Sequence, residues 1–292
     1  MSSSPLPPPI LEEARELLAR YDVVFSDAWG VLHDGLHAFS TASDALVRFR
    51  AKGGTVIVVS NAPLPETRVA EMLDSRGVPR AAWDAIVSSG EIALAHIVEM
   101  GYATARYIGP GDRDADFFAR SPAKPSALES AEAVVCTGLE NDADETPEEY
   151  RPLLERARAR ALPFVCANPD LVVDVGGRLY PCAGALADLY ERLGGRVFWA
   201  GKPHPVAYAK ALEVAGRLRG KAVARERVLV VGDAVRTDLV AAQNAGLDAL
   251  FIAAGIHRRE TMDAGRLSLE KLARLFVPGA PRALAAMTML RW

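Results

Sequence analysis

The sequence has little of what marks several classes of protein. It contains 3 cysteines in 292 residues, and their spacing matches no metal-binding motif. This small, odd number argues against a disulfide framework and favours buried thiols at Cys136, Cys166 and Cys182 in a reducing compartment. No apolar run approaches the roughly 20 residues that span a bilayer, and the N-terminal MSSSPLPPPI lacks the pattern of a signal peptide. We therefore expect a cytoplasmic protein with no membrane partner.

A strong excess of charge is also missing. The net charge is −3 and the isoelectric point is near 6.0, so no electrostatic attraction to nucleic acid is expected. No G-x-G-x-x-G follows the first predicted strand, because Gly30 and Gly35 are wrongly spaced for a dinucleotide-binding loop. What is present is a composition that is 50% hydrophobic and 24% charged, which is typical of a globular protein with a substantial core.

Apolar segments alternate with segments of helical periodicity along most of the chain. Strands are expected at Val23–Phe25, Thr55–Val59, Ile86–Val87, Arg106–Ile108, Ala133–Cys136, Pro163–Cys166, Arg196–Trp199, Val228–Val231 and Ala249–Ile252. Helices are expected at Leu11–Arg20, Ser43–Lys52, Glu66–Arg76 and Gly90–Met100. Strands that are apolar throughout are typical of a sheet covered by helices on both faces. The pattern predicts an α/β fold built on a doubly wound, Rossmann-like parallel sheet.

The middle of the chain differs in character from its two ends. It becomes looser from about Gly111 and carries an acidic stretch, Glu140–Glu145, which we expect to be a solvated loop rather than a metal site. We interpret residues 111–195 as a smaller α/β domain inserted into a core formed by residues 18–110 and 196–292. Residues 1–17 are expected to form an N-terminal arm and the start of the first helix. The basic, apolar segment Arg282–Trp292 is expected to be a helix packed on the core or on a partner.

Polar residues follow four of the apolar strands, where doubly wound sheets bind their ligands. These residues are Asp27, Ser60, Asn61, Lys202, Asp233 and Asp238. Each alone is compatible with an ordinary role as a turn residue, a helix cap or a surface charge. Together they supply what phosphoryl transfer requires, which is a nucleophile, oxygen ligands for a divalent cation and groups around the phosphate oxygens.

The residue types suggest a role for each position. Asp27 is suited to attack phosphorus and form an aspartyl-phosphate, and Asp27 and Asp233 offer the hard oxygen ligands that Mg²⁺ prefers. Ser60 and Lys202 are suited to hold phosphate oxygens. Asp238 is suited to position Lys202 or to accept a hydrogen bond from a metal-bound water.

In these motifs the sequence resembles the haloacid dehalogenase (HAD) superfamily, specifically its NagD-like class IIA phosphatases. The resemblance covers about residues 21–255, and its four motifs are Asp27–Val31 with Gly35, Ser60–Asn61, Gly201–Lys202–Pro203, and Gly232–Asp233 with Thr237–Asp238. It implies a Mg²⁺-dependent hydrolase that acts on a small phosphorylated metabolite. It also implies the larger α/β cap domain of this class, inserted between the second and third motifs.

The resemblance further assigns roles to single residues. It makes Asp27 the nucleophile and a Mg²⁺ ligand, Asp233 a second ligand, and Lys202 the group that stabilises the phosphate charge. Ser60 and Asn61 would bind the phosphate. Asn168-Pro169-Asp170 resembles the cap loop that reaches towards the substrate, which makes Asn168 and Asp170 substrate-binding candidates; a purely structural turn is the alternative. Gly184 resembles a further cap element, and caps of this class often mediate homodimers.

One position departs from the family pattern. The phosphatases of this family usually carry a second aspartate two residues after the nucleophile, where this chain has Trp29. The backbone carbonyl of Trp29 remains able to bind Mg²⁺, but an indole cannot serve as the general acid or base, a contribution worth roughly 10²–10⁴-fold in rate. Either the substrates have good leaving groups, or another residue substitutes, or the protein binds phosphorylated ligands with little or no turnover. His33, Asp34 and His204 are the nearby candidates for a substitute.

Overall fold

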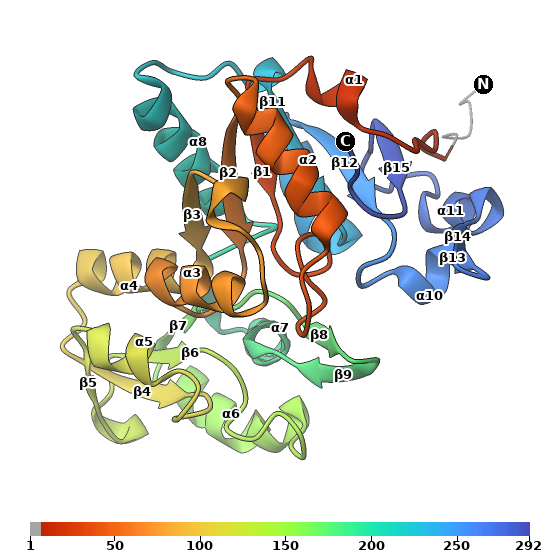
Figure 1. Cartoon of the computed structure of the whole chain (residues 1–292). Helices are drawn as coiled ribbons and strands as arrows, with labels where there is room; N and C mark the ends of the chain where they lie inside the picture. Colours follow the sequence, from red (N-terminus) through yellow and green to blue (C-terminus); the bar gives the residue numbers. More distant parts are fainter. Residues whose placement is uncertain (1–6) are drawn as a thin grey trace. The chain divides into compact units, whose positions relative to one another are not determined.

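Two parallel sheets organise the chain, as the computed structural model shows for residues 7–292. The larger sheet has six strands in the order β15-β12-β11-β1-β2-β3 (Figure 1). The smaller sheet has five strands in the order β10-β7-β6-β4-β5. Within these two sheets, neighbouring strands run parallel in every pair with a defined register. The predicted α/β fold with a doubly wound parallel sheet is therefore confirmed.

The element bounds follow the apolar segments of the sequence closely. The strands are β1 (Val23–Ser26), β2 (Thr55–Ser60), β3 (Ala85–Ser88), β4 (Thr104–Ile108), β5 (Lys124–Pro125), β6 (Ala133–Cys136), β7 (Pro163–Cys166), β8 (Val172–Val175), β9 (Arg178–Pro181), β10 (Arg196–Trp199), β11 (Val228–Gly232), β12 (Asp248–Ile252), β13 (Met262–Asp263), β14 (Arg266–Leu267) and β15 (Ala285–Met287). The helices are α1 (Arg15–Leu18), α2 (Ser40–Ala51), α3 (Glu66–Ser75), α4 (Ser89–Met100), α5 (Ala115–Arg120), α6 (Arg151–Ala159), α7 (Ala183–Arg192), α8 (Pro205–Arg219), α9 (Val240–Ala245), α10 (Arg258–Thr261) and α11 (Leu269–Leu275), with a π-helix, η5, at Val235–Leu239.

The first compact unit contains the centre of the larger sheet. Among the described residues it comprises residues 7–60, Ala70–Ile86 and Tyr208–Trp292. Every residue of β1, β2 and β11 is buried, because helices cover both faces of this sheet and leave no face for polar side chains. The side chain of Asp84 anchors this arrangement, since its Oδ2 accepts from the Val56 amide at 2.8 Å and from Arg50 Nε at 3.0 Å.

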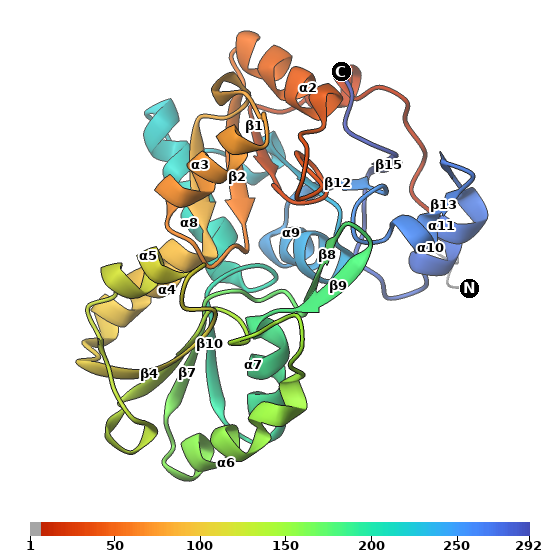
Figure 2. The same ribbon diagram turned by 60° about the horizontal axis from the view of Figure 1, so that its bottom comes forward.

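The second compact unit contains the smaller sheet and comprises Asn61–Val69 and Val87–Ala207. Helix α7 packs against β7 and β10 and also contacts α6 (Figure 2). The core of this unit includes Cys136 and Cys166, and Cys182 is also buried. Burial raises the pKa of the Cys182 thiol to about 12, so the predicted role of the cysteines as inert buried thiols agrees with their environment.

The limits of the two units differ from the residue ranges that the sequence suggests. Strands β4 and β10 belong to the smaller sheet, although the composition places both in the core. The loosening of the sequence near Gly111 is the turn after β4, which lies inside the second unit. The chain enters that unit first at Asn61 and again at Val87, within β3. The composition changes at this turn because glycine and proline are common both in turns within a domain and in linkers between domains.

The predicted helix at Arg282–Trp292 is wrong. This segment contains β15, which extends the larger sheet by pairing in parallel with β12, and its Ala286 is bridged by Ile10. Small, apolar residues are compatible with either an edge strand or a helix, so contacts with the rest of the fold decide which structure this segment forms. The same bridge explains why the first helix begins at Arg15 rather than near Leu11.

Within residues 7–292 no helix combines the length and the apolar character needed to cross a membrane.

Replacing Asp84 tests the anchor of the larger sheet. Asp84→Ala removes the acceptor of the Val56 amide and the carboxylate partner of the Arg50 guanidinium, so we expect a loss of about 2 kcal/mol in the free energy of unfolding. The measurement is urea denaturation followed by circular dichroism. Asp44→Ala is the matched control, because its ion pair with Arg48 is about half exposed and should contribute less than about 0.5 kcal/mol. Equal losses in both variants would contradict the anchoring role.

Candidate active site

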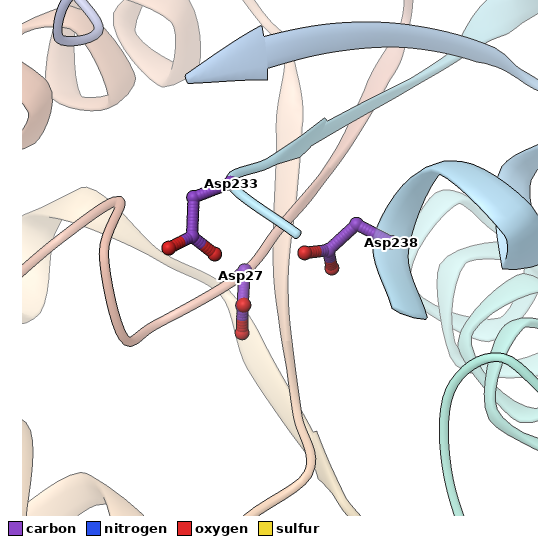
Figure 3. A group of neighbouring side chains, drawn as sticks. All are labelled: Asp27, Asp233 and Asp238. Atoms are coloured by element: carbon purple, nitrogen blue, oxygen red, sulfur yellow. The ribbon is translucent and has the colours of Figure 1, made fainter. Parts of the chain in front are cut away.

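Three carboxylates converge at the carboxyl ends of β1 and β11. Asp27 follows β1, while Asp233 and Asp238 follow β11, and one oxygen of each lies within 4.8 Å of the others (Figure 3). This is the only such cluster of three or more acidic, histidine or cysteine ligands among the residues placed by the structure. The parallel pairing of β1 with β11 brings the two strand ends together.

Asp27 is fixed by the backbone on both sides. Its amide donates to Val231 O at 2.8 Å, which extends the ladder between β1 and β11 by one residue. Its carboxylate Oδ1 accepts from the Ala28 amide at 2.7 Å. The carboxylate therefore has a defined direction at the end of a buried strand.

Asp233 is held by a loop that the sequence motifs do not include. The amide of Ile256 donates to Asp233 Oδ2 at 2.6 Å, and the side chain is only 4% exposed. A Cβ at Gly30 or at Gly255 would overlap this carboxylate, so both positions require glycine. The sequence could have indicated this loop, because the loop follows β12, the strand that neighbours β11 in the sheet.

Asp238 braces the turn that carries Asp233. It is fully buried, and its Oδ2 accepts from the Ala234 amide at 3.1 Å. It lies within the π-helix η5, a local widening that often marks functional sites. Its carboxylate is thus both part of the acidic cluster and a support for its neighbour.

A histidine adds a further support that the sequence did not reveal. The amide of Val235 donates to His257 Nε2 at 3.3 Å, and His257 Nδ1 lies 2.7 Å from Glu260 Oε2. These partners assign the ring proton to Nδ1, because Glu260 can only accept. The pair holds the start of η5, between Asp233 and Asp238.

The donor set of the cluster suits a divalent cation. Carboxylate oxygens are the ligands of hard cations such as Mg²⁺, and opposite ligands of an octahedral Mg²⁺ lie about 4 Å apart. Oxygens gathered within 4.8 Å are close to that spacing. Asp27, Asp233 and Asp238 are the residues that would hold such an ion.

Trp29 packs within its own loop. Its ring contacts His33 edge-on, with the ring centroids 5.1 Å apart, and lies so close to Gly35 that a Cβ there would overlap the indole. His33 in turn accepts from the Gly35 amide at 3.0 Å through Nδ1. The indole is therefore a packed part of the loop that follows Asp27.

None of the three candidates for a substitute general acid, His33, Asp34 and His204, lies in surroundings that mark it for that role. His33 is fully buried, and burial, with a further contribution from Arg76, lowers its pKa to about 4, so it carries no imidazolium at neutral pH. Asp34 accepts from the backbone N–H groups of His37 and Leu36, which hold its pKa below the ordinary value. It is thus an ionised turn residue. His204 lies in the second unit, stacked on Trp199 with centroids 5.0 Å apart.

The remaining candidate site residues lie in both units: Ser60 in the first, and Asn61, Asn168, Asp170 and Lys202 in the second. Ser60 ends β2, the strand next to β1, and is 8% exposed. In the second unit, Asn61 is hydrogen-bonded both to Asp170 and to the backbone of Lys202. Lys202 is only 1% exposed, which is rare for a lysine and typical of a functional or paired charge. Asn168 closes the turn that carries Asp170, since its Oδ1 accepts from the Asp170 amide at 3.1 Å.

Comparison with known proteins identifies the family. A model described as haloacid dehalogenase-like hydrolase matches residues 24–118, and a second HAD-hydrolase-like model matches residues 199–274. A crystal structure of a haloacid dehalogenase-like hydrolase from Brucella suis 1330 is 41% identical, with a TM-score of 0.84, over 96% of this chain and 99% of that one.

Two curated relatives show more local similarity. The ribonucleotide monophosphatase NagD of Escherichia coli (strain K12) is 32% identical over 102 residues, which are 35% of this chain and 37% of NagD. An acid sugar phosphatase of Staphylococcus aureus (strain USA300) is 30% identical over 98 residues, 33% of this chain and 36% of the relative. The chain thus matches only about a third of the length of these relatives. With the full-length match to the Brucella structure and the NagD-like motifs, the chain belongs to the haloacid dehalogenase-like hydrolase family, in its NagD-like class IIA.

Proposed function

We propose that this protein is a Mg²⁺-dependent phosphatase or phosphotransferase that acts on a small phosphorylated metabolite through an aspartyl-phosphate on Asp27. The observation that carries the proposal is the carboxylate cluster of Asp27, Asp233 and Asp238, gathered at the ends of adjacent parallel strands. A bound Mg²⁺ would neutralise charge on the phosphoryl oxygens. A cytoplasmic location and a homodimeric state belong to the same proposal and rest on composition and family resemblance.

The chemistry assigned to the chain has two steps. A carboxylate oxygen of Asp27 attacks phosphorus, the bond to the leaving oxygen breaks, and that oxygen leaves with the electron pair and takes a proton from water. Water then attacks the phosphoryl group, which releases inorganic phosphate and restores the carboxylate. Ser60, Asn61 and Lys202 are proposed to contact the phosphate, and the backbone carbonyl of Trp29 to ligate the metal. Asn168 and Asp170, which the family resemblance makes substrate-binding candidates, lie in one turn of the second unit.

The names of the curated relatives suggest the substrate class. NagD is named a ribonucleotide monophosphatase and the Staphylococcus relative an acid sugar phosphatase. Both substrate classes are phosphate monoesters with small organic groups. We propose the same chemical class for this chain.

Trp29 sets the expected limit on turnover. Its indole cannot protonate an alkoxide, and its ring is already packed against His33 and Gly35. We therefore propose a preference for esters whose leaving groups need little protonation, such as aryl and acyl phosphates. The alternative is a protein that binds phosphate esters with weak or no hydrolysis, and it is favoured by the same tryptophan.

Asp27→Asn tests the nucleophile. The amide keeps the size of the side chain but cannot form the phosphoenzyme, so hydrolysis of p-nitrophenyl phosphate in Mg²⁺ should fall by on the order of 10³-fold or more. The control is Asp22→Asn, directly before the same strand and paired with Arg227 at the surface. Initial rates with and without Mg²⁺ give the result. Activity retained in Asp27→Asn would exclude this residue as the nucleophile.

Mg²⁺ titration of thermal stability tests the cation site without relying on turnover. Binding to the native state alone stabilises by about 2.7 kcal/mol at a hundredfold excess over Kd, so the melting temperature of the wild type should rise with Mg²⁺. In Asp233→Asn this rise should be lost, while the metal-free variant should melt at or above the wild-type temperature because one of three clustered charges is gone. A rise of equal size in both proteins would place the ion elsewhere.

Trp29→Asp tests the missing general acid. Restoring a carboxyl group should raise the hydrolysis of alkyl phosphates by about tenfold or more and leave aryl phosphates less affected. Trp29→Asn is the matched control, because it opens the same space without adding an acid. The readout is the ratio of kcat/KM for an alkyl and an aryl phosphate. Fast turnover of alkyl phosphates by the wild type would show that another group supplies the proton.

A further inference from the structure

The side chain of Asn61 connects three separate parts of the second unit. Its Nδ2 donates to Asp170 Oδ1 at 2.9 Å and to the backbone carbonyl of Lys202 at 3.0 Å. Its Oδ1 accepts from the Lys202 amide at 2.9 Å. Asn61 is 4% exposed, so these bonds form out of contact with bulk water and hold both the N–H and the C=O of a single lysine.

The direction of this amide is decided by Asp170. A carboxamide has similar shape in its two flipped orientations, and only its partners determine which end is the donor. A carboxylate can only accept, so Asp170 requires the NH₂ group on its side. The Asn61 oxygen is then left facing the Lys202 amide, in the one orientation that satisfies both backbone groups of the lysine.

Asp170 is itself rigidly placed. Its amide donates to Asn168 Oδ1 at 3.1 Å, which closes the turn. The turn lies directly on α7, where a Cβ at Gly184 would overlap the carbonyls of Pro169 and Asp170. This contact gives Gly184 a structural reason to be glycine and fixes the height of the turn above the helix.

The loop that carries Lys202 is equally confined. A Cβ at Gly201 would overlap Asn61 Oδ1 and press on the Ser89 hydroxyl. The lysine backbone therefore has little room to shift while the Asn61 bonds persist. Removing those bonds would leave the N–H and the C=O of Lys202 without the Asn61 side chain as a partner.

We propose that Asp170 is a positioning residue that acts through Asn61 to fix Lys202, rather than a residue that reads the leaving group of the substrate. The inference deepens the proposed function and rests on the role of Lys202 as a phosphate-binding charge. A group that recognises the leaving group affects only esters that carry it. A group that positions Lys202 affects every phosphate ligand equally, including inorganic phosphate.

Asp170→Ala separates these roles. We expect the inhibition constant of inorganic phosphate to rise about tenfold, and kcat/KM to fall by a similar factor for p-nitrophenyl phosphate and for acyl phosphates alike. Asp170→Asn should recover most of the loss, because its carbonyl can still accept from Asn61. Asp188→Ala is the matched control, an exposed aspartate of α7 paired with Arg192. An unchanged phosphate inhibition constant, with losses that differ between esters, would overturn the proposal.

A double-mutant cycle checks that Asp170 acts through Asn61. Asn61→Ala should weaken phosphate inhibition at least as much as Asp170→Ala. The inhibition constant of the double variant should match that of Asn61→Ala within about twofold, because Asp170 no longer has an Asn61 side chain to orient. Multiplying effects would contradict the link. Melting curves establish that each variant is folded. A wild type that neither hydrolyses p-nitrophenyl phosphate nor binds phosphate would instead overturn the proposed function, and the role of Lys202 with it.

Discussion

The parallel pairing of β1 with β11 is the constraint on which the site depends. It continues one residue beyond β1, through the hydrogen bond from the Asp27 amide to Val231 O, and so places Asp27 beside the acidic turn after β11. Two unit charges about 4 Å apart repel by about 4 kcal/mol at an effective dielectric constant of about 20. The fold therefore holds Asp27, Asp233 and Asp238 together against their mutual repulsion, and a bound cation would relieve that repulsion.

Around these carboxylates the structure supplies backbone N–H groups. The amides of Ala28, Ile256 and Ala234 each donate to one carboxylate of the cluster. Such dipoles lower the cost of burying the acids without cancelling their charge, so the attraction for a divalent ion is retained. The close approach of backbone to carboxylate explains the glycine at Gly255, and at Gly30 it adds to a positive φ of 79° that already favours glycine.

The sequence predicted which residues lie at the ends of strands, but it did not predict features that depend on contacts between distant parts of the chain. An apolar strand followed by Asp27 or Asp233 identifies a position at the edge of a parallel sheet, and the structure gathers both there. The end of the chain was predicted as a helix, because nothing local reveals that β15 pairs with β12. The bond between Asn61 and Asp170 spans 109 residues, and no spacing rule relates such positions. Sequence could name both residues but could not show that they bind each other.

In the proposed reaction, the attack on phosphorus and the proton transfer to the leaving group depend on different parts of the chain. The acidic cluster is built by strand pairing and by the backbone amides that donate to its three carboxylates. The indole instead packs on His33 and Gly35, within the loop that follows Asp27. A change of side chain there can remove proton transfer and leave the geometry of attack intact. In the proposed mechanism, the departure of the leaving group, rather than the attack on phosphorus, is therefore the step at which substrates would be selected.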